Sequence, residues 1–177
     1  YLFTQKIFIK NKRPVVGPAG YKYFSYKDSD PYVKGSLILA TFRTVLNNDS
    51  LFFDMLKAFR IENNMKTVSS KSFMDFVNKK TGLNYDWFFN QYLYKREAPV
   101  LEYFWTQGKL YYRWTKVNDD FIMPAEMKGF NNETGEAILL NPTVNVQLKE
   151  VNVNSILFPT KTIFFGVKEN KKLIYLK

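Results

Sequence analysis

The chain has 177 residues, a formal net charge of +10 and a hydrophobic content of 46%. That length allows one large or two small domains with a substantial core, and no apolar run approaches the roughly eighteen residues of a membrane span. The sequence contains no His and no Cys. These absences exclude disulfides, thiolate metal sites, and imidazole groups for catalytic zinc or for acid–base work near neutral pH.

The positive charge is concentrated in the first part of the chain. Residues 1–97 hold 16 basic and 8 acidic residues, whereas residues 98–177 hold 10 and 8. A basic surface attracts nucleic acid, anionic membranes or acidic peptides. Here the lysines are scattered, and several basic pairs fall at expected helix ends, where a cation is favourable. We interpret the excess as a solvated surface rather than as a binding patch.

The first thirty residues are predicted to be a helix remnant followed by a loop. Residues 1–12 have the pattern of the last turns of a helix that Pro14 ends, and residues 14–31 are rich in Pro, Gly and Asp. The aromatic residues of this loop either line a cleft or pin the loop to the body of the protein. The chain begins at Tyr1 without Met, which suggests a piece of a longer protein, so the missing signal peptide says little.

A helix is predicted over residues 32–46. Asp30 can cap it by accepting from free backbone N–H groups, and Pro31 suits the first helical position. Tyr32 then lies in the first turn, where its hydroxyl can face a cleft. Gly35 inside a helix costs about 1 kcal/mol against Ala, so we expect a reason for it, such as the close approach of another backbone.

Three further helices are expected before residue 97, joined by short loops that favour antiparallel neighbours. The second spans 50–63, the third begins near residue 70 and the fourth spans 85–94. Their expected caps are Asp49 or Ser50, Ser69 or Ser70, and Asn84 or Asp86, with Gly82 ending the third helix. Their expected inward-facing residues are Leu51, Met55, Ala58, Phe59, Phe73, Phe76 and Val77, and most of the fourth helix.

The pattern changes at Ala98-Pro99. Alternating apolar and polar residues, β-branched and aromatic types and frequent turn dipeptides, among them Gln107-Gly108, then predict several short strands. That spacing favours a small antiparallel β-sandwich over residues 98–177. The fold class predicted for the whole chain is therefore α+β, with a helical part over residues 1–97 and a β part after it.

The carboxylates do not form an evident site. Asp28 and Asp30 flank the first loop, and Asp119-Asp120 lies in a turn. Neither pair has calcium-loop spacing, and turns favour Asp without any metal.

A set of motifs in the helical part resembles the M1 family of zinc aminopeptidases, downstream of their metal site. Tyr32, Lys34 and Gly35 open an apolar helix with Arg43 further on. Three later segments continue the likeness in order and spacing: Asn48–Phe53, Val68–Phe73 and Thr81–Leu93. Within them, three residues depart from the family pattern: Asn48, Ser72 and Tyr92. In the β part, Phe121-x-Met123-Pro124 resembles a strand of that family.

The resemblance implies a fold and a role for one residue. Residues 1–97 would be the C-terminal half of a thermolysin-like catalytic domain, followed by the β-sandwich. Tyr32 would be catalytic, its hydroxyl directed at the oxygen of the scissile carbonyl as that oxygen gains negative charge. Lys34 is expected to be structural or a surface charge rather than a substrate contact, and Arg43 an ion-pair partner within the fold.

The resemblance also implies a zinc aminopeptidase that removes N-terminal residues from peptides. This chain lacks the His-Glu-x-x-His helix of such enzymes, so we expect it to be inactive alone and to hold no metal or other cofactor. Zinc is expected in the intact enzyme, held by the upstream catalytic segment, with a peptide as substrate. No nucleic acid partner is expected. Location stays open, with a lean toward the extracytoplasmic side of a bacterial cell, periplasmic or secreted.

Two alternatives stay open. A basic, aromatic-rich chain has the composition of a non-catalytic interaction module that binds nucleic acid or glycan. A parent protein with the M1 fold that has lost its metal ligands is the other.

Overall fold

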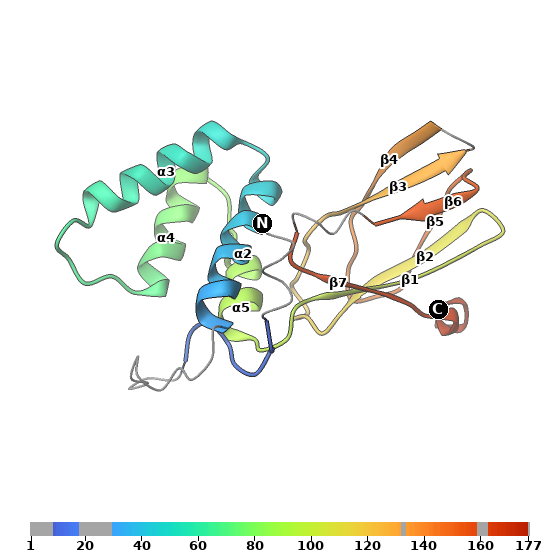
Figure 1. The fold of residues 1–177 in the computed structure, drawn as a ribbon, viewed down its shortest axis with the longest axis horizontal. Helices are drawn as coiled ribbons and strands as arrows, with labels where there is room; N and C mark the ends of the chain where they lie inside the picture. Colours follow the sequence, from blue (N-terminus) through green and yellow to red (C-terminus); the bar gives the residue numbers. More distant parts are fainter. Residues whose placement is uncertain (1–8, 18–29, 132–133, 159–162, 177) are drawn as a thin grey trace. The chain divides into compact units, whose positions relative to one another are not determined.

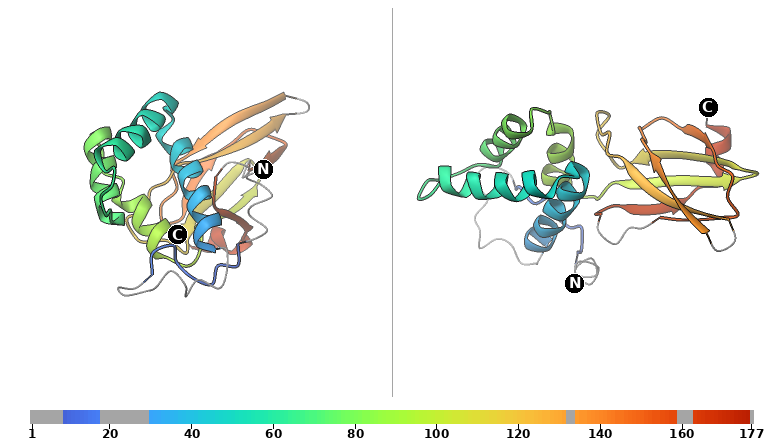
Figure 2. Two further views of the ribbon diagram at one scale, coloured as in Figure 1. Left: turned by 60° about the vertical axis from the view of Figure 1, so that its left-hand side comes forward. Right: turned by 90° about the horizontal axis from the view of Figure 1, so that it is seen from above.

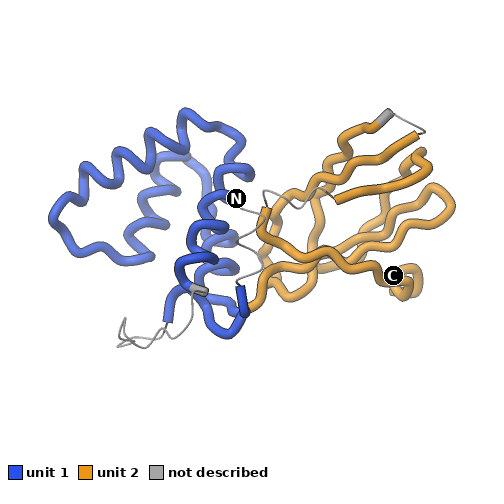
Figure 3. The backbone as a smooth tube through the Cα atoms, in the orientation of Figure 1, with its two compact units in different colours: residues 1–96 blue, residues 97–177 orange. Residues whose placement is uncertain are grey.

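The computed structural model describes residues 9–17, 30–131, 134–158 and 163–176. The chain divides into two compact units, residues 1–96 and 97–177, shown in two colours in Figure 3. The first unit is helical and the second is built of strands. A helical part followed by a β part was predicted, and both are present. No helix among the described residues has the length and apolar character needed to cross a membrane.

Four helices form the described core of the first unit. Each helix contacts the next along the chain, and the last returns to contact the first, so that they close a ring; Figures 1 and 2 show the first and last side by side. The helices are α2 (Asp30–Leu46), α3 (Asp49–Glu62), α4 (Ser70–Thr81) and α5 (Asp86–Tyr94).

Local side-chain hydrogen bonds set the helix boundaries. Asn48, rather than the predicted Asp49 or Ser50, caps α3, and its side chain accepts from the Leu51 backbone N–H. The α4 helix begins at a capping box, in which Ser69 accepts from the Ser72 amide and the Ser72 side chain accepts from the Ser69 amide. Gly82 ends α4 in the left-handed conformation with φ of 69°, as predicted.

Phe42 of α2 lies at the centre of the helical core. It is fully buried, and its ring centroid lies 5.0–5.4 Å from those of three residues at or next to α5, Tyr85, Phe88 and Phe89. The ring centroid of Phe52 in α3 lies 6.3 Å from that of Phe42 and completes the cluster. The predicted inward faces are correct for the middle of α5 but incomplete for α3 and α4. The buried residues of these two helices are Phe52, Met55, Met74 and Val77, and the remaining predicted ones are half-buried.

Two expectations for the start of the chain differ from the structure. Residues 9–12 are not helical, and the rest of the expected helix remnant lies outside the described residues. The aromatic residues of the loop and the side chain of Asp30 also lie outside them. At Gly35 no described atom comes within 4 Å of an added Cβ, so the described residues supply no close backbone approach as the reason for this glycine.

The second unit contains two sheets. The first has strand order β5-β2-β1-β7 and the second β4-β3-β6. The prediction of a purely antiparallel arrangement is wrong in one place, because β7 pairs with β1 in parallel. The elements are β1 (Val100–Thr106), β2 (Lys109–Thr115), β3 (Ala125–Asn131), β4 (Thr134–Leu140), β5 (Gln147–Glu150), β6 (Ser155–Leu157), β7 (Gly166–Glu169) and the 3₁₀ helix η2 (Lys171–Tyr175).

The hairpin between β1 and β2 forms at the predicted turn. Gln107 and Gly108 have φ of 48° and 73°, and Thr106 pairs with Lys109 across them. Two central residues with positive φ give a turn whose twist matches that of the flanking strands. The pair Gln107-Gly108 therefore sets the register of the hairpin.

Trp114 of β2 anchors the core of the second unit. Its ring packs edge-on against Phe121 and Phe165, with centroids 5.5 and 5.2 Å away, and its Nε1 donates to the Met123 carbonyl oxygen at 2.9 Å. Residues 121–124 belong to no strand, so the strand expected there is wrong. Phe121 and Met123 are fully buried all the same; their apolar alternation reflects core packing of an irregular segment.

Candidate functional site

Tyr32 lies in the first turn of α2, and its side chain is 57% exposed. The turn that carries it starts at Asp30, so Tyr32 sits at the open end of the helix, where backbone N–H groups lack intrahelical partners. A phenol at this position can donate a hydrogen bond to a group that approaches from solvent. Its role in chemistry is not tested by the fold and stays a prediction.

The exposed face of α2 continues from Tyr32 along the helix. Ser36, Leu39 and Arg43 follow at helical spacing and are all exposed. The opposite face is buried, with its apolar residues directed to the core: Val33, Leu37, Ile38 and Phe42. The α2 helix is therefore amphipathic, and Tyr32 lies on its exposed side.

Arg43 forms the ion pair expected of it. Its Nε donates to Asp49 Oδ1 at 2.7 Å, and its guanidinium carbon lies 4.9 Å from the centroid of the Phe53 ring. The hydrogen bond between the two side chains raises the pKa of Arg43 and lowers the pKa of Asp49. Both partners are well exposed, so the pair links the end of α2 to the start of α3 with little effect on stability.

Lys34 differs from every other described lysine in being buried, with 1% of its surface exposed. Its Nζ donates to the backbone carbonyl oxygens of Arg13 at 2.7 Å and Arg96 at 2.8 Å. The sequence allowed a structural lysine or a surface charge; the structural role is confirmed and the surface charge is wrong. No local signal could have identified the two acceptors, because they are distant in sequence and neither is a side chain.

The residues of this chain do not fit a catalytic zinc ion. Such an ion needs three protein ligands, usually His with an acidic residue or Cys. The sequence holds no His and no Cys, and the described residues contain no cluster of three acidic side chains. His or Cys ligands for such an ion would have to come from outside this chain.

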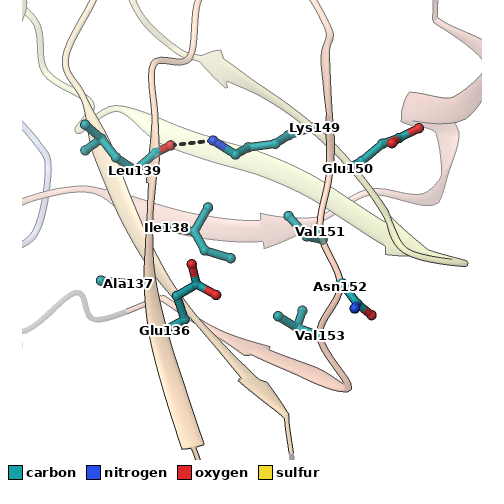
Figure 4. A pocket seen from close by; sticks show the side chains of 9 residues that line it. All are labelled: Glu136, Ala137, Ile138, Leu139, Lys149, Glu150, Val151, Asn152 and Val153. Carbon is teal, nitrogen blue, oxygen red and sulfur yellow. Dashed lines mark hydrogen bonds between the residues drawn. The ribbon is translucent and has the colours of Figure 1, made fainter.

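A shallow hollow of about 310 Å³ lies in the second unit, between β4 and the segment that follows β5 (Figure 4). Ile138, Val151 and Val153 form its apolar floor, and Lys149 Nζ donates to the Leu139 carbonyl oxygen at 3.2 Å across one end. The lining residues offer two separate carboxylates, Glu136 and Glu150, but no set of groups arranged for catalysis. Tyr32 is not among these residues.

Glu102 of β1 is the centre of a charged cluster in the second unit. It is directly opposite Arg113 of β2 and Lys168 of β7 in the sheet. Arg113 donates to it at 3.0 Å, Asn170 at 3.0 Å and Lys168 at 3.4 Å. This cluster joins three strands and the start of η2. No pattern in the sequence identifies it, because its members meet only through the strand register.

The aromatic residues do not form an exposed stacking surface among the described residues. The described aromatic residues are buried or half-buried except for four that are well exposed: Tyr32, Phe53, Tyr94 and Tyr175. Binding of single-stranded nucleic acid depends on aromatic side chains that are open to bases. The described residues therefore add no support for nucleic-acid binding, and the interaction-module alternative stays a prediction.

Comparison with known proteins gives one kind of result, a likeness of fold. No protein-family model and no curated protein matches the sequence. Among solved structures, the chain is similar to a crystal structure of aminopeptidase A from Legionella pneumophila in complex with aspartic acid, with a TM-score of 0.64 and 12% identity. The match covers 90% of this chain and 20% of that one, so the chain spans about a fifth of the aminopeptidase's length. The chain thus has a fold similar to that of part of an aminopeptidase.

Proposed function

We propose that this chain is the downstream part of a zinc aminopeptidase of the M1 family. In this proposal residues 1–97 are the second half of a thermolysin-like catalytic domain, and residues 98–177 form a supporting β-sandwich. The intact enzyme removes N-terminal residues from peptides. Its zinc is bound by an upstream segment, and this chain supplies Tyr32 and part of the substrate cleft.

The observation that carries the proposal is the position of Tyr32. It stands exposed at the open end of α2, inside a motif that resembles the M1 pattern, in a chain whose fold is similar to that of part of an aminopeptidase. The motif and the fold likeness are independent forms of support, because one depends on residue identity and spacing and the other on backbone geometry.

The chemistry proposed for Tyr32 is the stabilisation of developing negative charge. When water adds to a scissile peptide carbonyl, the carbonyl oxygen gains charge, and a neutral O–H donor held in place binds it more strongly than it binds the ground state. One such donor contributes about 3–4 kcal/mol to the transition state. A phenol is suited to this because its ordinary pKa of about 10 keeps it protonated at neutral pH.

The test is Tyr32→Phe in the full-length protein that contains this chain. We expect kcat for an N-terminal aminoacyl substrate to fall by about 10² or more, with zinc content and thermal stability unchanged. The matched control is Tyr94→Phe, another exposed tyrosine of the first unit, which should leave kcat unaltered.

Three results would count against the proposal. An unchanged kcat in Tyr32→Phe would remove this residue from the mechanism. A full-length protein without a His-Glu-x-x-His helix, or one that binds no zinc, would instead be a member of the fold that has lost its metal. Salt-dependent binding of oligonucleotides by the purified chain would favour the interaction-module alternative.

A further inference from the structure

Lys34 is a buried cation with no role in the chemistry described above. An ammonium group loses its hydration when it is buried, and this is tolerated only where hydrogen bonds replace the lost water. Lys34 has such replacements in the carbonyl oxygens of Arg13 and Arg96. Neither acceptor belongs to α2, so the position of the first turn of this helix is fixed from outside it.

The two acceptors come from segments that are themselves joined. The Val16 backbone N–H donates to the Leu93 carbonyl oxygen at 2.9 Å, which links residues 13–17 to the last turn of α5. Arg96 follows directly after the C-cap of that helix. The C-terminal end of a helix carries partial negative charge, so an ammonium group placed there is favoured by the helix as well as by its two carbonyl partners.

Lys34 and Tyr32 lie two positions apart in the first turn of α2, so the positions of their side chains depend on the same stretch of backbone. Residues two apart on a helix point to opposite sides, and the exposures agree with this: Lys34 is 1% exposed and Tyr32 57%. Rotation or sliding of the first turn would therefore shift the inward and outward side chains together. The hydrogen bonds from the Lys34 ammonium group to its two carbonyl oxygens therefore also fix the backbone position from which the Tyr32 side chain starts.

We propose that Lys34 is a positioning residue, which fixes the first turn of α2 against residues 13–17 and the end of α5 so that the Tyr32 hydroxyl is held at the reacting carbonyl. This inference rests on the proposed function of Tyr32. Its physical basis is that a displacement of about 1 Å in a catalytic group can lower a rate by about 10², whereas substrate binding by the rest of a cleft is unaffected.

The first experiment uses the full-length enzyme and compares Lys34→Met with the exposed control Lys57→Met. Met keeps an unbranched apolar stem of similar shape and lacks the ammonium group. We expect kcat to fall by about 10-fold to 10²-fold with KM and zinc content unchanged, and the control to behave as wild type. Lys34→Arg keeps the positive charge and should recover part of the loss.

A double mutant separates positioning from a general structural role. If Lys34 acts through Tyr32, Lys34→Met should lower kcat no further in a Tyr32→Phe background, because the group being positioned is absent. A loss that multiplies the loss of Tyr32→Phe would overturn the inference, and so would an unchanged kcat in Lys34→Met. Both results would leave the proposed function of Tyr32 intact.

Hydrogen exchange on the 177-residue chain gives a readout that does not depend on activity. Lys34→Met should speed exchange in residues 13–17, the first turn of α2 and residues 93–96, with α3 and α4 unchanged. Exchange rates in these three segments that are the same in wild type and in Lys34→Met would overturn the inference. If Lys34→Met does not fold, the same measurement on Lys34→Arg decides, with faster exchange confined to the three segments as the expected result. A harmless Tyr32→Phe combined with this local exchange pattern would refute the proposed function of Tyr32, and with it the catalytic purpose of the positioning, while showing that Lys34 does fix the first turn of α2.

Discussion

At the scale of single residues, the carboxylate of Glu102 shows how burial and hydrogen bonding compete. Burial by itself raises the pKa of Glu102, but hydrogen bonds from Asn170, Arg113 and Lys168 together outweigh it, and the net pKa is lowered. The side chain is only 8% exposed. Its charge is therefore kept inside the sheet by partners on both neighbouring strands and on the segment that begins η2.

A lowered pKa in the folded state makes the stability of the second unit depend on pH. The contribution of Glu102 is fully present above its unfolded value of about 4.3 and is lost as the pH falls through the folded value. We predict that Glu102→Gln lowers the free energy of unfolding by about 1–3 kcal/mol at pH 7. The difference from wild type should shrink as the pH falls below the unfolded value and through the lower folded value, where the wild-type carboxyl becomes protonated in the native state too.

Urea unfolding followed by near-ultraviolet circular dichroism between pH 3 and pH 7 measures this difference. Glu126→Gln is the matched control, since Glu126 is an exposed glutamate of the same unit. A gap between wild type and Glu102→Gln that stays constant across this pH range would show that the charge of Glu102 does not contribute.

At the scale of elements, the start of α4 depends on two side chains that satisfy each other's backbone. Ser69 Oγ lies 3.1 Å from the Ser72 backbone nitrogen, and Ser72 Oγ lies 2.9 Å from the Ser69 nitrogen. The other end of α4 lies at Gly82, a residue without a Cβ, at the point where the backbone takes the left-handed conformation. Both ends of α4 are therefore fixed by residues next to them in sequence.

Removing the cap should destabilise the helical unit by a limited amount. We predict that Ser69→Ala lowers the free energy of unfolding by about 1 kcal/mol, because the Ser72 amide then loses its acceptor. Ser70→Ala, one residue further on, should change it by less than about 0.5 kcal/mol. Chemical denaturation followed at 222 nm measures both, and equal effects of the two substitutions would show that the cap does not stabilise α4.

At the scale of the whole molecule, each unit has a core of its own. Phe42 is fully buried among aromatic rings of the helical unit, and Leu101 is fully buried in β1 of the strand unit. Compact units with separate cores are able to unfold separately. The chain should therefore show two components in thermal unfolding.

Substitutions in the two cores test this separation. We predict that Phe42→Ala destabilises the helical unit by about 3–5 kcal/mol and that Leu101→Ala destabilises the strand unit by about 2–5 kcal/mol. In calorimetry each change should lower the midpoint of one component and leave the other in place. Leu139→Ala, at a site that is 58% exposed, should move neither. A single transition that shifts as a whole in both core variants would show that the units unfold together.

Short-range features of the fold follow from neighbouring residues and were predictable from the sequence. The caps at Ser69 and Gly82 and the hairpin at Gln107-Gly108 each depend on hydrogen bonds or backbone preferences within a few residues. The same reasoning predicted the buried aromatic character of α5. It failed at α3, where Asn48, Asp49 and Ser50 are all good caps and local preference does not distinguish Asn48, the residue that accepts from the Leu51 backbone N–H.

The sequence by itself determined that a helical part precedes a β part, that zinc ligands of the His or Cys type are absent, and that Tyr32 lies in the first turn of a helix. The tertiary structure alone decided that Lys34 is buried on two backbone carbonyls, that β7 pairs in parallel with β1, and that Glu102 meets cations from two strands. The physical reason is distance along the chain. These contacts join segments 11 to 68 residues apart, and no local propensity encodes which backbone oxygen or which strand a side chain will meet.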